Sequence, residues 1–211
     1  MDRRRRFLLQ AIASLAAAAW LGAACLGDPL AQVAPAHVLS GPALLDALHR
    51  GGLVLYFRHA ETDFGQNDDA MTSFNDCSRQ RNLTDTGRAH ARAIGHSFAT
   101  LRIPVGDVLV SPYCRTRETA QLIFGRATVS MAVRGGPPSD RARYAELEKL
   151  LSQPVDGGVN RVIVSHGNPF HAVTGSAYLA EGEAAVIEPR GNDGFRVVGR
   201  VKWDGWEALT R

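Results

Sequence analysis

The sequence lacks the residue spacings of a metal-binding protein. Its seven histidines include no H-x-H or H-x-x-x-H pair, and its three cysteines join no Cys/His cluster with the spacing of zinc ligands. We therefore expect neither a metal ion nor another cofactor, and a periplasmic metal-binding protein is disfavoured. Five histidines have no accompanying motif and are expected to be structural or on the surface: His37, His49, His90, His96 and His171.

The chain has little excess basic charge outside its first 36 residues. Its formal net charge is +3, but residues 1–36 contain four Arg and two Asp, so only +1 remains for the rest. A near-neutral body gives no support to a nucleic-acid partner, because domains that bind nucleic acids carry clustered basic residues. That body also lacks internal repeats and low-complexity segments, and its length suits one domain with a good-sized core.

Residues 1–36 have the pattern of an export signal and a linker. Arg3–Arg6 precede an uncharged, Ala- and Leu-rich stretch at residues 7–24, which is the order of regions in a signal peptide. The junction RRRFLL also resembles the twin-arginine pattern R-R-x-F-L. We expect a protein exported to the periplasm, with its domain in residues 37–211. Whether residues 7–24 are cleaved, kept as a membrane anchor or followed by lipidation at Cys25 stays open, and we expect membrane contact through this segment alone.

Three short apolar runs, each followed by polar residues suited to chemistry, organise the rest of the chain. The runs at residues 53–57, 107–110 and 161–165 lead to Arg58 with His59, to Arg115 and to His166, respectively. Such runs, alternating with amphipathic helical patterns, predict an α/β domain with a mainly parallel sheet. Because α/β proteins bind ligands at the carboxyl edge of the sheet, we expect these side chains to share one rim.

The remaining elements follow from helical and alternating patterns. Helices are predicted at about residues 40–50, 84–98, 112–124, 139–152 and 168–179, and closing strands at 184–189 and 195–201. Residues 125–139 are predicted to form a loop. Residues 63–82 are polar and aperiodic, and we interpret this long segment as a flap over the site. Its Arg79 and Arg81 could reach an anionic substrate, but the sequence favours ordinary surface charges.

Four motifs occur along the chain: RHAET at 58–62, LTDTGRAHA at 83–91, SPYCRTRETA at 111–120 and VSHG at 164–167. In this order they resemble the histidine phosphatase superfamily, also called the phosphoglycerate-mutase-like fold, over about residues 53–180. The resemblance implies a single α/β domain with a mainly parallel central sheet and helices on both faces. It also implies a metal-independent phosphoric monoester hydrolase that works through a phosphohistidine.

The expected roles of the four rim residues follow from phosphoryl chemistry, and the resemblance assigns the same roles. Phosphoryl transfer needs mainly positioning and neutralisation of charge. His59 is the candidate nucleophile, because a neutral imidazole can form a phosphohistidine. Arg58 and Arg115 are candidate clamps for the phosphoryl oxygens through charge-assisted hydrogen bonds. His166 is the candidate for a further hydrogen bond to the same group.

The acid that protonates the leaving group is not evident from the motifs. The sequence departs from the mutase branch at Gly65, where that branch has Asn, and in RATVSMAVRGG, where that branch supplies a Glu. These departures argue against a sugar-phosphate mutase. Glu183 is our candidate proton donor and Asp63 is the rival, although both could be surface carboxylates.

The sequence thus favours an exported phosphatase that hydrolyses phosphomonoesters. The expected partner is a phosphorylated small molecule or an envelope glycolipid phosphate, and phosphohistidine is another substrate class. The alternative is a non-catalytic phosphate- or phosphoglycan-binding module of the same fold. The missing acid favours that alternative, and the presence of both arginines and both histidines disfavours it.

The two cysteines outside the signal segment form an even pair in a chain that we expect to be exported. Cys77 lies in the flap and Cys114 directly precedes Arg115. Disulfides persist outside the cytoplasm, so a Cys77–Cys114 bond could fasten the flap beside the site. Two unpaired buried thiols are the alternative.

Overall fold

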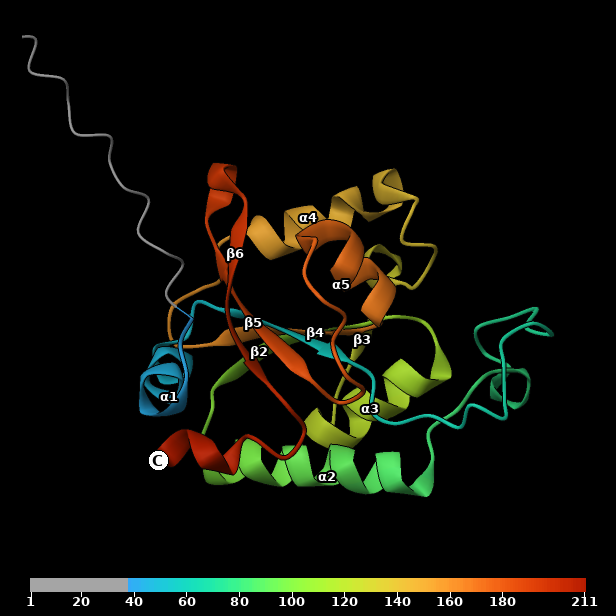
Figure 1. Cartoon of the computed structure of the whole chain (residues 1–211), viewed down its shortest axis with the longest axis horizontal. Coiled ribbons are helices and arrows are strands. Elements are labelled where there is room, and N and C mark those ends of the chain that lie inside the picture. Colours follow the sequence, from blue (N-terminus) through green and yellow to red (C-terminus); the bar gives the residue numbers. More distant parts are fainter. Residues whose placement is uncertain (1–37) are drawn as a thin grey trace, which may run out of the picture. The chain divides into compact units, whose positions relative to one another are not determined.

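A six-stranded sheet with the strand order β3-β2-β4-β1-β5-β6 runs through the part of the chain that the computed structural model describes, residues 38–211 (Figure 1). The strands are β1 (Val54–Arg58), β2 (Val105–Val110), β3 (Thr128–Val129), β4 (Asn160–Ser165), β5 (Ala184–Pro189) and β6 (Phe195–Val201). The first four pair in parallel, whereas β5 and β6 run antiparallel to their neighbours. The expected mainly parallel sheet with two closing strands is therefore confirmed.

Five α-helices cover the two faces of this sheet. They are α1 (Gly41–Arg50), α2 (Asp85–Thr100), α3 (Cys114–Phe124), α4 (Ala145–Ser152) and α5 (Gly167–Thr174). Helices α1, α2 and α3 lie on one face, and α4 and α5 lie on the other (Figure 1). Short 3₁₀ turns at Cys77–Arg79, Met131–Val133, Arg141–Tyr144, Gly191–Asp193 and Glu207–Thr210 complete the described elements.

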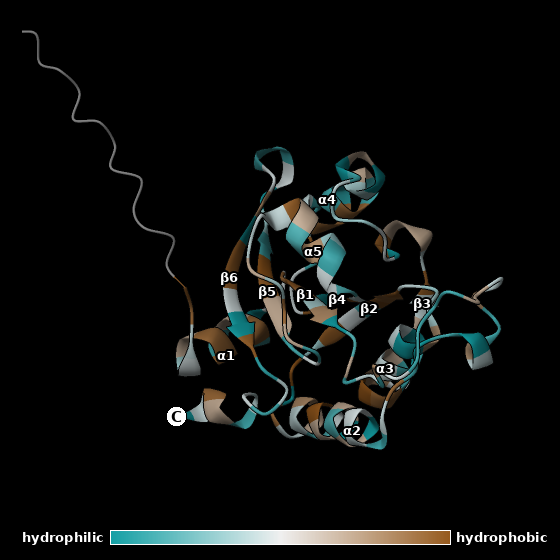
Figure 2. Ribbon diagram, turned by 45° about the vertical axis from the view of Figure 1, so that its right-hand side comes forward, coloured by the Kyte–Doolittle hydropathy of each residue, from teal (hydrophilic) through white to brown (hydrophobic). Residues whose placement is uncertain are grey.

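The strand β1 shows how the sequence builds two cores. Successive side chains of a strand point to opposite faces, so Leu55 and Phe57 pack with α1, α2 and α3, while Val54 and Tyr56 pack with α4 and α5. All four side chains are buried, because both faces of the strand are covered. Figure 2 shows the apolar colour on the central strands and polar colour over much of the outer helix surfaces. The apolar part of this buried strand therefore ends at Phe57, where the polar pair Arg58 and His59 begins.

The motif RHAET is tied to the start of α2. Thr84 caps this helix, since its Oγ1 accepts a hydrogen bond from the Gly87 N–H at 2.9 Å and donates one to Glu61 Oε1 at 2.7 Å. Gly87 lies so close to the backbone of Glu61 that an added Cβ would overlap it. The glycine of LTDTG is therefore required by the close approach of two motifs that lie far apart in the sequence.

Several predicted boundaries are wrong, for local reasons. Helix α3 begins at Cys114 and not at residue 112, since Tyr113 keeps extended backbone angles. Helix α5 ends at Thr174, because Gly175 takes a left-handed conformation with φ of 66°. Residues 125–139 are not loop throughout, since they contain β3 and one 3₁₀ turn. The segment predicted as one helix over residues 139–152 begins with a 3₁₀ turn before α4.

The expected export signal in residues 1–36 lies outside the described residues. Within residues 38–211, no helix is long and apolar enough to cross a membrane.

Candidate active site

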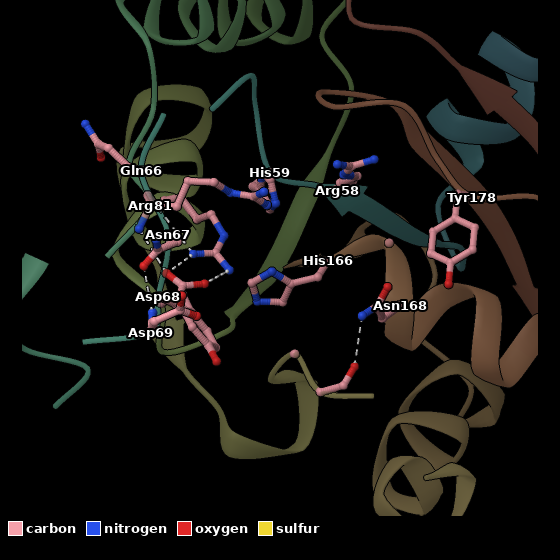
Figure 3. Close-up of a pocket in the computed structure, with 15 residues that line it drawn as sticks. Arg58, His59, Gln66, Asn67, Asp68, Asp69, Arg81, His166, Asn168 and Tyr178 are labelled. Atoms are coloured by element: carbon pink, nitrogen blue, oxygen red, sulfur yellow. Dashed lines mark hydrogen bonds and ion pairs between the residues drawn. The ribbon is translucent and has the colours of Figure 1, made fainter. Parts of the chain in front are cut away.

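A cavity of about 510 Å³ opens where β1 and β4 end, beside the start of α3 and under the segment of residues 63–82, which we call the flap (Figure 3). It is lined by the four residues predicted to share a rim, Arg58, His59, Arg115 and His166. The cavity is also lined by Gln66, Asn67, Asp68, Asp69, Arg81, Tyr113, Gly135, Gly136, Gly167, Asn168 and Tyr178. The sheet thus brings together the four side chains that the motifs singled out.

The hydrogen bond of His59 determines which of its ring nitrogens can react. Nδ1 lies 2.9 Å from the carbonyl oxygen of Ala60. A carbonyl can only accept, so Nδ1 must carry the proton and Nε2 must carry the lone pair. Burial is the main reason why the pKa of His59 lies well below its usual value, and the positive charges of Arg115 and Arg58 lower it further. The ring is therefore a neutral imidazole with an unprotonated Nε2, the form that attacks phosphorus.

Three arginines that line the cavity have side-chain N–H groups without a hydrogen-bond partner among the described residues. Among the described residues, five buried side-chain nitrogens have no hydrogen-bond partner, and three of these are Nε atoms of arginines that line this one cavity: Arg58, Arg81 and Arg115. A buried donor without a partner costs about 1–3 kcal/mol. An anion bound among the three guanidinium groups would provide the missing acceptors.

Arg58 is held from behind by the segment that precedes β5. Its Nη1 donates to the Leu179 carbonyl at 2.9 Å, and its Nη2 donates to Glu181 Oε1 at 3.2 Å. The same carboxylate accepts hydrogen bonds from the backbone N–H and the hydroxyl of Thr62, at 3.1 and 2.8 Å. Glu181 therefore fixes the guanidinium of Arg58 and the last residue of RHAET together.

The guanidinium group of Arg115 contacts the flap. Its Nη1 and Nη2 donate to Asp68 Oδ1 and Oδ2, each at 3.0 Å, in a bidentate pair. Its guanidinium also lies over the ring of Tyr113, 4.4 Å from the centroid. The Arg115 side chain is 6% exposed and that of Asp68 is 31% exposed, so the pair is partly screened from water. The fork that is suited to two phosphoryl oxygens is occupied by a carboxylate in this structure.

His166 follows β4 and lies beside His59. The two ring centroids are 5.5 Å apart at an interplanar angle of 69°. Nε2 of His166 is 2.8 Å from the hydroxyl oxygen of Ser111. Burial lowers the pKa of His166 well below its usual value, and the neighbouring His59 lowers it further. His166 is therefore neutral in the absence of an anion.

The flap is fastened by a disulfide and by one buried amide. Cys77 and Cys114 are joined by a disulfide, which is the pairing proposed from the sequence. Gln80 is 2% exposed, and its Oε1 accepts a hydrogen bond from the Cys114 N–H at 2.9 Å. Because Cys114 directly precedes Arg115, both links join the flap to the helix end that presents this arginine.

The structure contradicts the assignment of Glu183 as proton donor. Glu183 does not line the cavity. Its Oε1 and Oε2 accept hydrogen bonds from Arg200 at 2.8 and 2.9 Å, and Oε2 accepts another from the Ala180 N–H. Burial alone would raise the pKa of Glu183, but these hydrogen bonds outweigh it and keep the pKa below its usual value. A carboxylate that is ion-paired with Arg200 and does not line the cavity is a structural residue. Asp63, the rival, does not line the cavity either.

Several lining residues were not selected from the sequence. Arg81, interpreted there as a surface charge, lies in the cavity, with its guanidinium 4.7 Å from the centroid of the Phe64 ring. Asp68 was not considered. Tyr178 lies beyond the end of α5 because Gly175 stops that helix, which turns Tyr178 toward the cavity. The sequence signal for Arg81 was its place two residues before LTDTG; nothing in the sequence marked Asp68 among its polar neighbours.

No group of three or more His, Cys, Asp or Glu side chains lies within residues 38–211 in an arrangement that could hold a metal ion.

One family model matches part of the chain, and solved structures share its fold. The family model described as the histidine phosphatase superfamily (branch 1) matches residues 54–136. A mycobacterial glucosyl-3-phosphoglycerate phosphatase, solved with inorganic phosphate, is 14% identical, with a TM-score of 0.55, and the match covers 72% of this chain and 99% of that one. A mutant phosphoserine phosphatase from Entamoeba histolytica, solved with phosphoserine, is 12% identical, with a TM-score of 0.51 and coverage of 72% and 98%. At these identities the solved structures show the shared fold. No curated protein sequence matches the chain.

Proposed function

Since the chain belongs to the histidine phosphatase superfamily, we propose that it hydrolyses phosphomonoesters through a phosphohistidine on His59. The observation that carries this proposal is the hydrogen bond from His59 Nδ1 to the Ala60 carbonyl. It forces the lone pair onto Nε2, and burial keeps that nitrogen unprotonated near neutral pH. A buried imidazole that stays unprotonated keeps its lone pair available for attack on phosphorus.

The charge around His59 supports transfer of a phosphoryl group. In the proposed first step, Nε2 attacks phosphorus while the guanidinium groups of Arg58, Arg115 and Arg81 hold the non-bridging oxygens. A phosphoryl dianion near His166 would favour its protonated form and so add a further donor. Water then attacks the phosphohistidine, releases inorganic phosphate and restores the imidazole. The positive charge of the arginines and His166 is why we propose that hydrolysis needs no metal ion.

We propose a phosphorylated small molecule or an envelope glycolipid phosphate as the substrate, with phosphohistidine as a further class. The cavity supports a leaving group of some size, because residues 66–69 lie on one side of His59 and His166 and Asn168 and Tyr178 lie on the other (Figure 3). The sequence supports export, through Arg3–Arg6 and the apolar stretch at residues 7–24.

The first test is hydrolysis of p-nitrophenyl phosphate by the purified protein, with and without a chelator. We expect turnover that the chelator leaves unchanged and that His59→Ala removes. Arg92→Ala, a substitution of an exposed arginine on α2, serves as the control. Binding of phosphate without any turnover would instead favour a non-catalytic phosphate-binding module.

A further inference from the structure

The proton donor that the motifs leave unassigned can be sought among the carboxylates of the cavity. Only two carboxylates occur among the described residues that line it, Asp68 and Asp69, and both lie on the flap. Asp69 is exposed, and the one hydrogen bond found for it comes from its backbone N–H to Asn67 Oδ1. Asp68 is half-buried and contacts Arg115. The two neighbours in sequence therefore differ in their relation to the phosphate-binding residues.

Asp68 is held at three points. Oδ1 accepts hydrogen bonds from Arg115 Nη1 at 3.0 Å and from the Arg81 backbone N–H at 2.9 Å, and Oδ2 accepts one from Arg115 Nη2 at 3.0 Å. The carboxylate therefore contacts the same guanidinium group that would bind a phosphoryl oxygen. Figure 3 shows it on the flap side of the cavity, across from Asn168 and Tyr178, with His166 between them.

Resting on the proposed phosphatase function, we propose that Asp68 is the catalytic acid that protonates the leaving group. The phosphoryl oxygens and the carboxylate compete for the same two Nη donors of Arg115. When a phosphoryl group takes this fork, Asp68 loses its cationic partner and gains an anionic neighbour. Both changes favour uptake of a proton by the carboxylate. The acid is thereby formed beside the bond that breaks, and it is formed by substrate binding itself.

The proposed steps balance as follows. The lone pair of His59 Nε2 forms the N–P bond, the bond from phosphorus to the bridging oxygen breaks, and its electron pair goes to that oxygen. The carboxyl proton of Asp68 goes to the same oxygen, so that an alcohol leaves and a carboxylate remains. In the second step that carboxylate accepts a proton from the attacking water, while the N–P electron pair returns to His59.

A purely structural role for Asp68 makes a different prediction. If the carboxylate only positions Arg115, its loss weakens the binding of every phosphate ester to the same degree. If it is the acid, its loss harms only substrates whose leaving oxygen needs a proton. Nitrophenolate leaves readily without protonation, whereas an alkoxide does not. The dependence of the rate on the leaving group therefore separates the two roles.

The test compares Asp68→Asn with wild type on p-nitrophenyl phosphate and on an alkyl phosphate such as glycerol phosphate. We expect turnover of the aryl ester to stay within about tenfold of wild type, and turnover of the alkyl ester to fall on the order of a hundredfold or more, the usual contribution of a general acid. Wild-type activity on the alkyl ester should also decline at high pH, and this decline should be absent in Asp68→Asn. Asp68→Glu should restore part of the selective loss.

Asp63→Asn is the matched control, since Asp63 lies on the same segment outside the cavity and keeps its hydrogen bond with the Gly65 N–H as an amide. Equal losses on both esters, no loss on either, or a selective loss in Asp69→Asn in place of Asp68→Asn would each overturn the assignment. Absence of aryl phosphate turnover in wild type would instead refute the proposed phosphatase function, so the two failures can be told apart.

Discussion

The strand side of the cavity and its flap side hold their functional groups in different ways. On the strand side, Arg58 and His59 follow β1 and His166 follows β4, and the parallel register pairs Arg58 with Ser165. On the flap side, Asp68 and Arg81 lie in a segment with one short 3₁₀ turn, held by the Cys77–Cys114 disulfide and by side-chain hydrogen bonds. The sheet therefore fixes the position of the nucleophile His59. The positions of Asp68 and Arg81 instead depend on the disulfide and on a few polar contacts of the flap. We expect formation of the phosphohistidine to depend on the strand side, and substrate binding together with protonation of the leaving group by Asp68 to depend on the flap side.

Among the arginines of the cavity, Arg115 should have the largest effect when replaced, because it lies at the start of α3 beside the strand ends and contacts the flap through Asp68. We expect Arg115→Ala to reduce kcat/KM on p-nitrophenyl phosphate by about a hundredfold or more, since one preorganised donor is worth about 2.7–4 kcal/mol of barrier. The melting temperature should change little. Steady-state kinetics and thermal melts of the variant, with Arg92→Ala as control, make the comparison. Normal kinetics in a folded Arg115→Ala protein would show that this guanidinium is not a phosphate ligand.

Replacement of Arg81 should sharpen the distinction between the two sides. Arg81 reaches the cavity from the flap, and its Nε is one of the three unpartnered donors. We expect Arg81→Ala to raise KM by about tenfold, the usual weight of a hydrogen bond to a charged group, and to leave kcat within a few-fold of wild type. A large fall in kcat with unchanged KM would contradict this role and would mean that Arg81 acts mainly on the transition state.

Removal of the disulfide should loosen the flap without disturbing the strand ends. The chain-entropy model gives roughly 3–4 kcal/mol for a loop of the size closed by Cys77 and Cys114. We expect a Cys77→Ser/Cys114→Ser protein to unfold at a lower denaturant concentration and to bind inorganic phosphate more weakly, while it still forms the phosphoenzyme. The bond itself is checked by intact mass of the protein with and without reduction before alkylation. Two free thiols in the untreated protein would contradict the pairing.

The smallest effect concerns pH. His59 and His166 are buried with pKa values well below the usual one. As the pH falls through about 6.5, the unfolded chain binds protons that the folded chain does not, so the free energy of unfolding should decrease on acidification. We expect His166→Gln to reduce the slope of this decrease by up to about 1.4 kcal/mol per pH unit. Urea melts between about pH 7 and 5, with His96→Gln as control for loss of an exposed imidazole, measure it. An unchanged slope would mean that His166 gains its proton in the folded state.

The strand side was the part of the site that the sequence could predict. A buried strand must be apolar on both faces, so the change from Phe57 to Arg58 marks its end, and parallel strands bring such ends together. No comparable rule predicts where the side chains of the flap lie. Asp68 stands among polar residues with no periodicity, and only the fold brings it to Arg115, 47 residues further along the chain. Glu183 was misassigned for the same reason: its neighbour in space, Arg200, comes from the adjacent antiparallel strand β6.

The central claim is that the strand side carries the nucleophile, and a trapped phosphoenzyme tests it most directly. Wild-type protein and His59→Ala are mixed with ³²P-labelled substrate, quenched within milliseconds and assayed for protein-bound label. We predict label on the wild type that is stable to base and labile to acid, as expected of a phosphohistidine, and none on His59→Ala. Label of equal amount on both proteins, or turnover by His59→Ala at the wild-type rate, would contradict the account.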